Sequence, residues 1–200
     1  MEFFKKMFKL LILLVSFTVI GISPLVYASG PMEDAAIKNV QRKEVLNEEE
    51  RQRISTAAGL LADYEIAAKK LVYSLDEDGI NATKINEQAN NLLNLSENII
   101  DKTHFRLPQC KEYLAKTLTL KNNLKEISHD TLEKDYHHDG ALPKAPVECY
   151  HTKDLFVHPA TVLVLTRDDP ALSPETKTSI SSEITEVIGH TEVVRELVIY

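Results

Sequence analysis

Residues 47–79 read NEEERQRISTAAGLLADYEIAAKKLVYSLDEDG, and this stretch decides the class of fold. Asn47 is a favourable helix N-cap, and the three glutamates after it complement the positive end of a helix dipole. Asp78-Gly79 supplies a stop signal. Apolar side chains recur between these signals at three- and four-residue spacing, which predicts a long helix with one buried face. They are Ile54, Ala58, Leu61, Tyr64, Ala68, Leu71, Val72 and Leu75.

Three later segments repeat this pattern. Thr83 is the predicted cap of the second helix, Pro108 opens the third, and Ser173-Pro174-Glu175 announces the fourth with a cap followed by a first-turn proline. Each helix is apolar on one face only, so each needs partners, and the short connections favour antiparallel neighbours. The sequence predicts an all-α fold over residues 47–200. Its expected form is a four-helix bundle with one long, partly irregular crossover, residues 129–167, between helices 3 and 4.

Residues 1–28 have the layout of a secretory signal peptide. Three lysines precede an apolar run, and Val26-Tyr27-Ala28 forms a small-residue cleavage pattern. The run is shorter than the roughly 20 residues needed to span a bilayer, which favours cleavage before Ser29 over retention as a membrane anchor. We therefore expect an exported protein, periplasmic or extracellular. Residues 29–46 are polar and are predicted to form a flexible lead-in.

The composition limits the kinds of partner. The chain has a formal net charge of −7, and cleavage of residues 1–28 would remove three lysines and only one glutamate. An acidic surface repels phosphate backbones, and the chain has no basic stripe with interleaved aromatics, so we expect no nucleic acid partner. After cleavage we expect no membrane association either. Metal cations or a protein partner in the cell envelope remain, and the oligomeric state is left open.

The chain has two cysteines, Cys110 and Cys149. In an oxidising compartment an even and minimal count predicts one disulfide. Two thiols kept reduced as soft metal ligands are the alternative. The predicted bond would tie the crossover back to the helix that opens near Pro108.

The crossover is the predicted site, because residues 129–167 hold five of the seven histidines. Imidazole suits zinc, copper and nickel, which makes a transition-metal site the specific hypothesis. Its candidate ligands are His137, His138, His151 and His158, with Asp139, Asp135 or Glu148 as a nearby carboxylate. No His-Glu-x-x-His or paired Cys-x-x-Cys motif supports it. Adjacent histidines on a helix point about 100° apart, so one pair would share an ion only on a distorted turn. Histidines that cap a helix or hydrogen-bond in the core are the alternative.

A proline interrupts the apolar run that ends the crossover. Residues 152–167 are predicted to form a helical turn and then a short buried helix, divided at Pro159, with a strand as the alternative.

Polar residues also fall on the predicted apolar faces. Helical phase places Glu65, Ser96, Lys121 and Thr191 near the middle of the four helices, one on each. They would form a polar layer in which Glu65 pairs with Lys121 to fix register or serve a ligand. In the alternative, these two long side chains sit at the helix edges and extend their charges to water.

Two other functions correspond to short patterns in the sequence. Non-covalent haem binding would use His104 and His190, because the chain has no Cys-x-x-Cys-His motif. His138-Asp139 resembles the dyad of the metal-dependent phosphohydrolases named after that pair, which are also all-helical. The resemblance covers these two residues alone and lacks the following pattern of His and Asp on successive helices.

Together these patterns predict a soluble, exported helical-bundle protein that binds a transition metal. The alternative is a structural or protein-interaction module of the cell envelope with no ligand. No nucleophile elbow or glycine-rich phosphate loop favours an enzyme.

Overall fold

The computed structural model describes residues 46–200. Within this range the chain forms six α-helices and no strand, which confirms the all-α prediction. The predicted signal peptide, and all but the last residue of the predicted lead-in, lie outside the described residues. No helix between residues 46 and 200 has the length and apolar character needed to cross a membrane.

Helix α3, Glu48–Ser74, begins where the sequence predicts. The Asn47 side chain accepts a hydrogen bond from the Glu50 amide at 2.9 Å, and the Glu50 carboxylate accepts one from the Asn47 amide at 2.9 Å. This reciprocal capping box satisfies two of the amides that a helix start leaves without partners. The helix ends before the predicted stop at Gly79, whose φ of 74° favours glycine.

Helices α4, Ala82–Thr103, and α8, Pro174–Ile199, also follow their sequence signals. The α8 cap is Ser173 with Pro174 in the first turn, as predicted. The α4 cap is Asn81 and not Thr83: the Asn81 side chain accepts from the Lys84 amide at 3.1 Å.

Helix α7, Glu148–Asp168, contradicts the prediction of a break at Pro159, because it runs unbroken through that residue. A proline inside a helix has no amide to offer the carbonyl four residues earlier, here that of Leu155. The structure supplies another donor, since the buried Tyr64 hydroxyl of α3 donates to Leu155 O at 2.7 Å. Burial raises the pKa of Tyr64 well above its ordinary value, so the phenol keeps its proton. The helix continues because α3 satisfies the carbonyl that proline leaves free.

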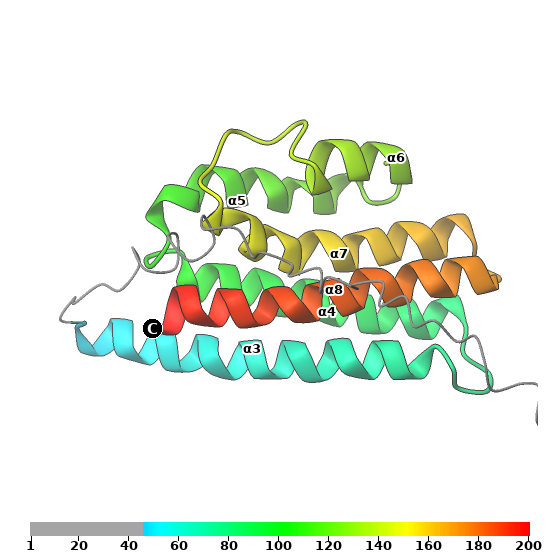
Figure 1. The fold of residues 1–200 in the computed structure, drawn as a ribbon, viewed down its shortest axis with the longest axis horizontal. Coiled ribbons are helices and arrows are strands. Elements are labelled where there is room, and N and C mark those ends of the chain that lie inside the picture. The colour runs from blue at the N-terminus through cyan, green and yellow to red at the C-terminus, as the bar shows by residue number, and fades with distance from the viewer. Residues whose placement is uncertain (1–45) are drawn as a thin grey trace, which may run out of the picture. The chain divides into compact units, whose positions relative to one another are not determined.

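The four long helices pack side by side (Figure 1). Helix α3 lies against α4 and α8, and α7 lies against the same two helices. Their apolar faces form the main core, which includes Leu61, Leu71, Ile85, Leu92, Ile99, Leu155, Val162, Ile184, Val187 and Val194.

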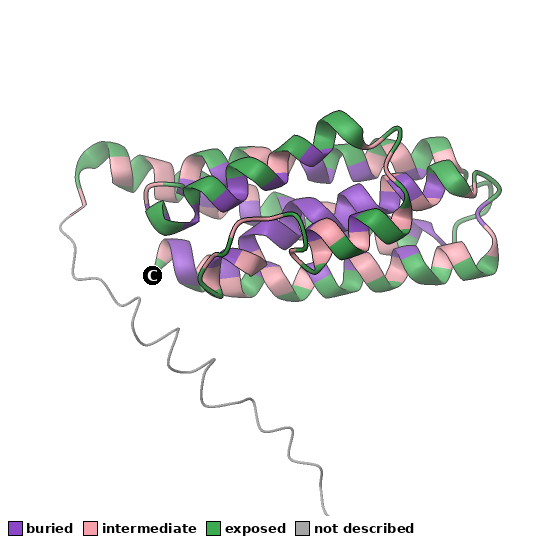
Figure 2. Ribbon diagram, turned by 90° about the horizontal axis from the view of Figure 1, so that it is seen from above, coloured by how far each residue is buried: buried purple, intermediate pink, exposed green. Residues whose placement is uncertain are grey.

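A layer of short elements lies against the remaining side of α7. It consists of the 3-10 turn η1 (Pro108–Cys110), α5 (Lys111–Leu118), the 3-10 turn η2 (Thr119–Asn123), α6 (His129–Leu132) and the π-helix η3 (Glu133–His137). A second apolar core joins Leu120 and Leu132 of this layer to Phe156 and Val157 of α7. Helix α7 is therefore covered on every side along its middle. Among the described helices it has the longest unbroken run of buried residues, 152–162 (Figure 2).

The predicted roles of two segments are exchanged. The segment that starts at Pro108 is not one long helix, and most of residues 129–167 is not an external crossover. The third long helix is α7, drawn from the predicted crossover, while α5 and its flanking turns cover it. The physical reason is the composition of α7: its apolar residues lie on more than one face and pack into two cores, so the helix needs cover on more than one side, whereas the segment after Pro108 is amphipathic.

A disulfide joins the covering layer to α7. The sulfurs of Cys110 and Cys149 are 2.03 Å apart and their Cα atoms 5.4 Å apart, and both residues are fully buried. The predicted pair is therefore formed, and it fixes η1 to the first turn of α7.

The predicted Glu65–Lys121 pair is not formed. Glu65 lies 2.6 Å from Lys69 on its own helix and 3.2 Å from Arg195 of α8, and its pKa is lowered by these two hydrogen bonds. Lys121 lies in η2, outside the four long helices, and pairs with Glu97 at 2.7 Å. Both charges sit at partly exposed edges, which was the alternative interpretation.

Ser96 and Thr191 are buried, as the polar layer required. Each hydroxyl donates to a carbonyl of its own helix, at 2.8 Å for Ser96 and 2.6 Å for Thr191. The four residues therefore do not make a connected polar layer.

Candidate metal centre

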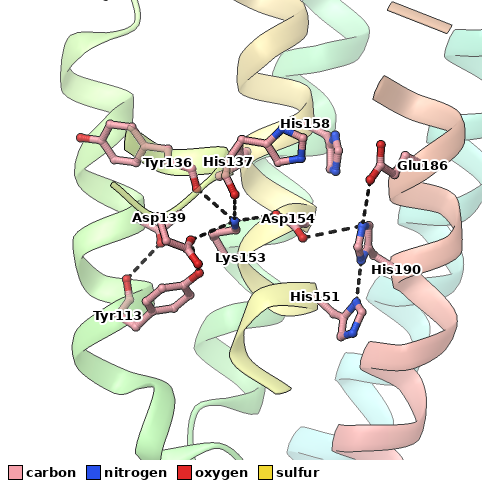
Figure 3. Close-up of polar contacts among 12 residues, drawn as sticks. Tyr113, Tyr136, His137, Asp139, His151, Lys153, Asp154, His158, Glu186 and His190 are labelled. Carbon is pink, nitrogen blue, oxygen red and sulfur yellow. Dashed lines mark hydrogen bonds and ion pairs between the residues drawn. The ribbon is translucent and has the colours of Figure 1, made fainter. Parts of the chain in front are cut away.

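Helices α7 and α8 carry two polar triplets with the same spacing. They are His151, Asp154 and His158 on α7, and Glu183, Glu186 and His190 on α8. Steps of three and four residues place a triplet on one face of a helix. The short turn between the helices makes them antiparallel, so the two faces meet, and η3 brings His137 to the same place (Figure 3).

Five imidazole rings form a continuous row at this meeting point. The distances between ring centroids are 5.2 Å for His138–His137, 4.9 Å for His137–His158, 5.5 Å for His158–His190 and 4.9 Å for His190–His151. The row starts at an exposed residue, His138, and passes through the fully buried His158.

His158 is the centre of the row and has an unsatisfied nitrogen. Its Nδ1 lies 2.8 Å from a carboxylate oxygen of Glu183. An ionised carboxylate can only accept, so Nδ1 carries a proton, and in the tautomer that carries only this proton Nε2 is an acceptor. Nε2 is buried and has no hydrogen-bond partner. A buried acceptor left in this state costs about 1–3 kcal/mol, a cost that a bound metal ion removes.

His137 is held in the same way. Its Nδ1 lies 2.8 Å from Glu133 Oε2, which leaves its Nε2 available. Burial lowers the pKa of His137, but the hydrogen bond and charge of Glu133, with the charges of Asp154 and Glu183, outweigh burial and raise this pKa. The surroundings of the ring therefore favour its protonated, positively charged form. A carboxylate behind a histidine is also the usual outer partner of a metal-bound imidazole.

The π-helix explains how two adjacent histidines come together. The His138 amide donates to Glu133 O at 2.8 Å, a five-residue step that widens the turn. The rings of His137 and His138 are consequently stacked, with an angle of 19° between their planes. The turn that follows requires glycine, because a Cβ at Gly140 would lie 2.6 Å from Lys134 O. This is the distorted turn without which neighbouring histidines could not share an ion.

Asp154 supplies a carboxylate at the inner end of the site. The residue is 6% exposed, and its Oδ2 lies 3.6 Å from His190 Nε2. Its Oδ1 is 3.0 Å from Lys153 Nζ, but without hydrogen-bond geometry, so this buried oxygen lacks a hydrogen-bond partner. The carboxylate is thus ion-paired with Lys153 and belongs to one group of candidate ligands with His137 and His158.

Lys153 fixes the end of η3 on α7. The side chain is 2% exposed, and Nζ donates to Tyr136 O at 3.0 Å, His137 O at 2.7 Å and Asp139 Oδ1 at 3.1 Å. Asp139 Oδ1 also accepts from the Tyr113 hydroxyl at 2.6 Å. A buried lysine needs such partners to keep its charge, and together they position the backbone of His137.

His190 is suited to bind a metal at neutral pH. Burial lowers its pKa to about 4, against the opposing charge of Asp154 and with help from His158 and His151. The ring is therefore neutral near pH 7. Its Nδ1 lies 2.7 Å from His151 Nδ1, and its Nε2 faces Asp154.

Three groups of side chains place their ligand atoms within 4.8 Å of one another. The groups are Glu133–His137–His138, His137–Asp154–His158 and His158–Glu186–His190. The second and third share His158, and Asp154 adjoins His190. Each of these two groups has two imidazoles and one carboxylate, Asp154 in one and Glu186 in the other. Nitrogen ligands of this kind suit zinc, copper(II) and nickel, whereas magnesium and calcium prefer oxygen alone.

The sequence located this centre only in part. His137, His138 and His158 are brought together, and His151 joins the row through His190. Asp139 lies outside the three groups, and its carboxylate accepts from Lys153 and Tyr113.

Four participants were missed. They are Asp154, Glu183, Glu186 and His190. Their signal was the shared spacing H-x-x-D-x-x-x-H and E-x-x-E-x-x-x-H on two helices that adjoin in sequence. That signal requires α7 to be a continuous helix, which the sequence did not predict.

The structure gives the haem candidates different neighbours. His104 Nδ1 contacts Asp101 O at 2.6 Å and Arg53 at 3.2 Å, whereas His190 lies in the histidine row. The His138-Asp139 dyad is likewise divided, because His138 stacks on His137 while Asp139 binds Lys153.

No protein-family model, curated protein or solved structure matches this chain.

Proposed function

We propose that this protein is an exported transition-metal-binding protein. Its ion would be held by His137, His158, His190 and Asp154, between η3 and the helices α7 and α8. The four long helices would form a four-helix bundle that serves as the rigid frame of the site. Binding in bundle cores by side chains from facing helices is a recurrent use of this architecture.

The observation that carries the proposal is the state of His158. The ring is fully buried, a carboxylate holds its Nδ1, and its Nε2 has no partner among the described residues. In a purely structural histidine both nitrogens would be satisfied, because an orphaned buried acceptor reduces stability. A metal ion bound at Nε2 explains why the protein keeps this arrangement.

The ligand chemistry favours zinc, copper(II) or nickel. Both cysteines are in the disulfide, so no thiolate is offered to a softer ion. His190 is neutral near pH 7, and Asp154 adds the single carboxylate that balances part of the ionic charge.

Export is supported by the disulfide as well as by the predicted signal peptide. Disulfides persist in the periplasm and outside the cell and are rare in the cytosol. A cell-envelope location also fits a site that acquires a metal ion from the surroundings.

The test is stabilisation by stoichiometric metal. An ion at 100 times its Kd adds about 2.7 kcal/mol to the free energy of unfolding, or roughly 5–10 °C in Tm for a domain of this size. We expect zinc, copper(II) or nickel to raise the Tm of EDTA-treated protein by this amount. Elemental analysis should find one bound ion.

The matched control is a histidine outside the row. His158→Ala should abolish the rise in Tm. His104→Ala should leave it intact, because the His104 ring contacts Arg53 and Asp101 and lies outside the histidine row. A wild-type melting curve unchanged by all three ions would refute the proposal and favour a ligand-free interaction module of the cell envelope.

A further inference from the structure

The proposed ion position is buried, so an ion needs a route from solvent. His158 is 0% exposed, and the Asp154 side chain is 9% exposed. The group Glu133–His137–His138 lies nearer to the surface. The side chains of Glu133 and His137 are 25% and 20% exposed, and His138 is exposed.

His137 belongs to both the outer and the inner group. Its ring is stacked on His138 on one side, with centroids 5.2 Å apart, and meets the edge of His158 on the other, at 4.9 Å and 74°. One imidazole therefore adjoins a ligand of each position.

Glu133 contributes an oxygen to the outer group. Its Oε2 holds His137, whereas its Oε1 is buried and has no hydrogen-bond partner. His129 Nε2 lies 3.9 Å from Oε1, beyond hydrogen-bond distance. The outer group therefore has an unused acceptor of its own, independent of His158.

We propose that Glu133, His137 and His138 form an outer capture position, from which His137 passes the ion to Asp154 and His158. This rests on the proposed function. The transfer is a ligand exchange in which His137 stays bound: bonds from the ion to His138 and Glu133 break as bonds to His158 Nε2, His190 and the Asp154 carboxylate form. The ion keeps its charge, and no oxidant or reductant takes part.

The experiment measures how fast the metal-free, full-length mature protein takes up cobalt(II), whose visible absorption reports its ligands. His138→Ala removes an outer ligand and none of the inner ones, although it also removes the ring stacked on His137. We expect uptake to slow by about tenfold, the lower range for removing a group that supports metal binding. The final absorption spectrum and the stoichiometry should match the wild type, because the inner ligands are intact.

One control variant and one measurement on the wild type keep the outcomes separate. His104→Ala, a histidine outside the row, should take up cobalt at the wild-type rate. An unchanged rate in His138→Ala refutes the capture position, and an altered final spectrum also refutes it, because His138 would then be a permanent ligand. Wild-type protein that binds no cobalt, zinc, copper or nickel at all refutes the proposed function itself.

Discussion

The continuity of α7 through Pro159 should depend on one hydroxyl group of α3. Tyr64→Phe removes the hydroxyl that donates to the Leu155 carbonyl in place of the missing proline amide. Tyr64 is 0% exposed, so water cannot replace the hydroxyl. We expect the free energy of unfolding to fall by about 1–3 kcal/mol, the cost of a buried carbonyl left without a partner.

The reasoning is tested by a double-mutant cycle with Pro159→Ala. Alanine restores the amide at position 159, and this amide can donate to Leu155 O within the helix. The cost of Tyr64→Phe should therefore drop below about 1 kcal/mol in the Pro159→Ala background, since the carbonyl then keeps a partner. The measurement is urea unfolding of all four proteins, followed by far-ultraviolet circular dichroism.

A matched tyrosine provides the control. The Tyr113 hydroxyl donates to Asp139 and has no contact with the Leu155 carbonyl, so Tyr113→Phe should cost the same with proline or alanine at position 159. Equal costs of Tyr64→Phe in the two backgrounds would show that the hydroxyl does not compensate for the proline.

The remaining predictions concern the disulfide and pH. Replacing Cys110 and Cys149 together by alanine removes a bond between residues 39 positions apart, so the unfolded chain gains conformational freedom. The free energy of unfolding should fall by about 4 kcal/mol in urea titrations, and a loss below about 1 kcal/mol would contradict this. Thiol titration of the unreduced, denatured wild type should find no free thiol, and two would refute the bond. Metal-free protein should lose stability as pH falls from 6.5 toward 4. The pKa of His190 is lowered to about 4 in the folded state, so the unfolded chain binds the proton more tightly. This contribution, about 3 kcal/mol, is present above pH 6.5 and lost as pH falls through 4. His190→Gln should flatten the dependence in urea titrations at fixed pH, and an unchanged slope would contradict the assignment.

Local signals in the sequence predicted the helix starts well. The capping box of Asn47 and Glu50 and the Ser173-Pro174 start of α8 depend on residues within a few positions of each other. Such signals are readable because the interacting groups are neighbours in the chain. The all-α class follows from the same periodicity.

The errors arise where distant residues decide the outcome. Pro159 breaks a helix unless another group satisfies Leu155 O, and that group is Tyr64, 91 residues away from Leu155 in sequence. Once α7 was divided, the shared spacing on α7 and α8 had no structural meaning, and His190 was considered only as a haem ligand with His104. The site was therefore predicted in an external crossover, although most of the candidate ligands lie on two helices.

The complete covering of α7 has a consequence for how this protein can change over time. A helix with no solvent-exposed face has no position at which a charged side chain can be introduced without being buried. Accepted substitutions between residues 152 and 166 should therefore preserve side-chain volume. The outer surfaces of α3 and α8 have no such restriction. Divergent descendants should thus be easier to recognise by the register of α7 against α8 than by overall identity.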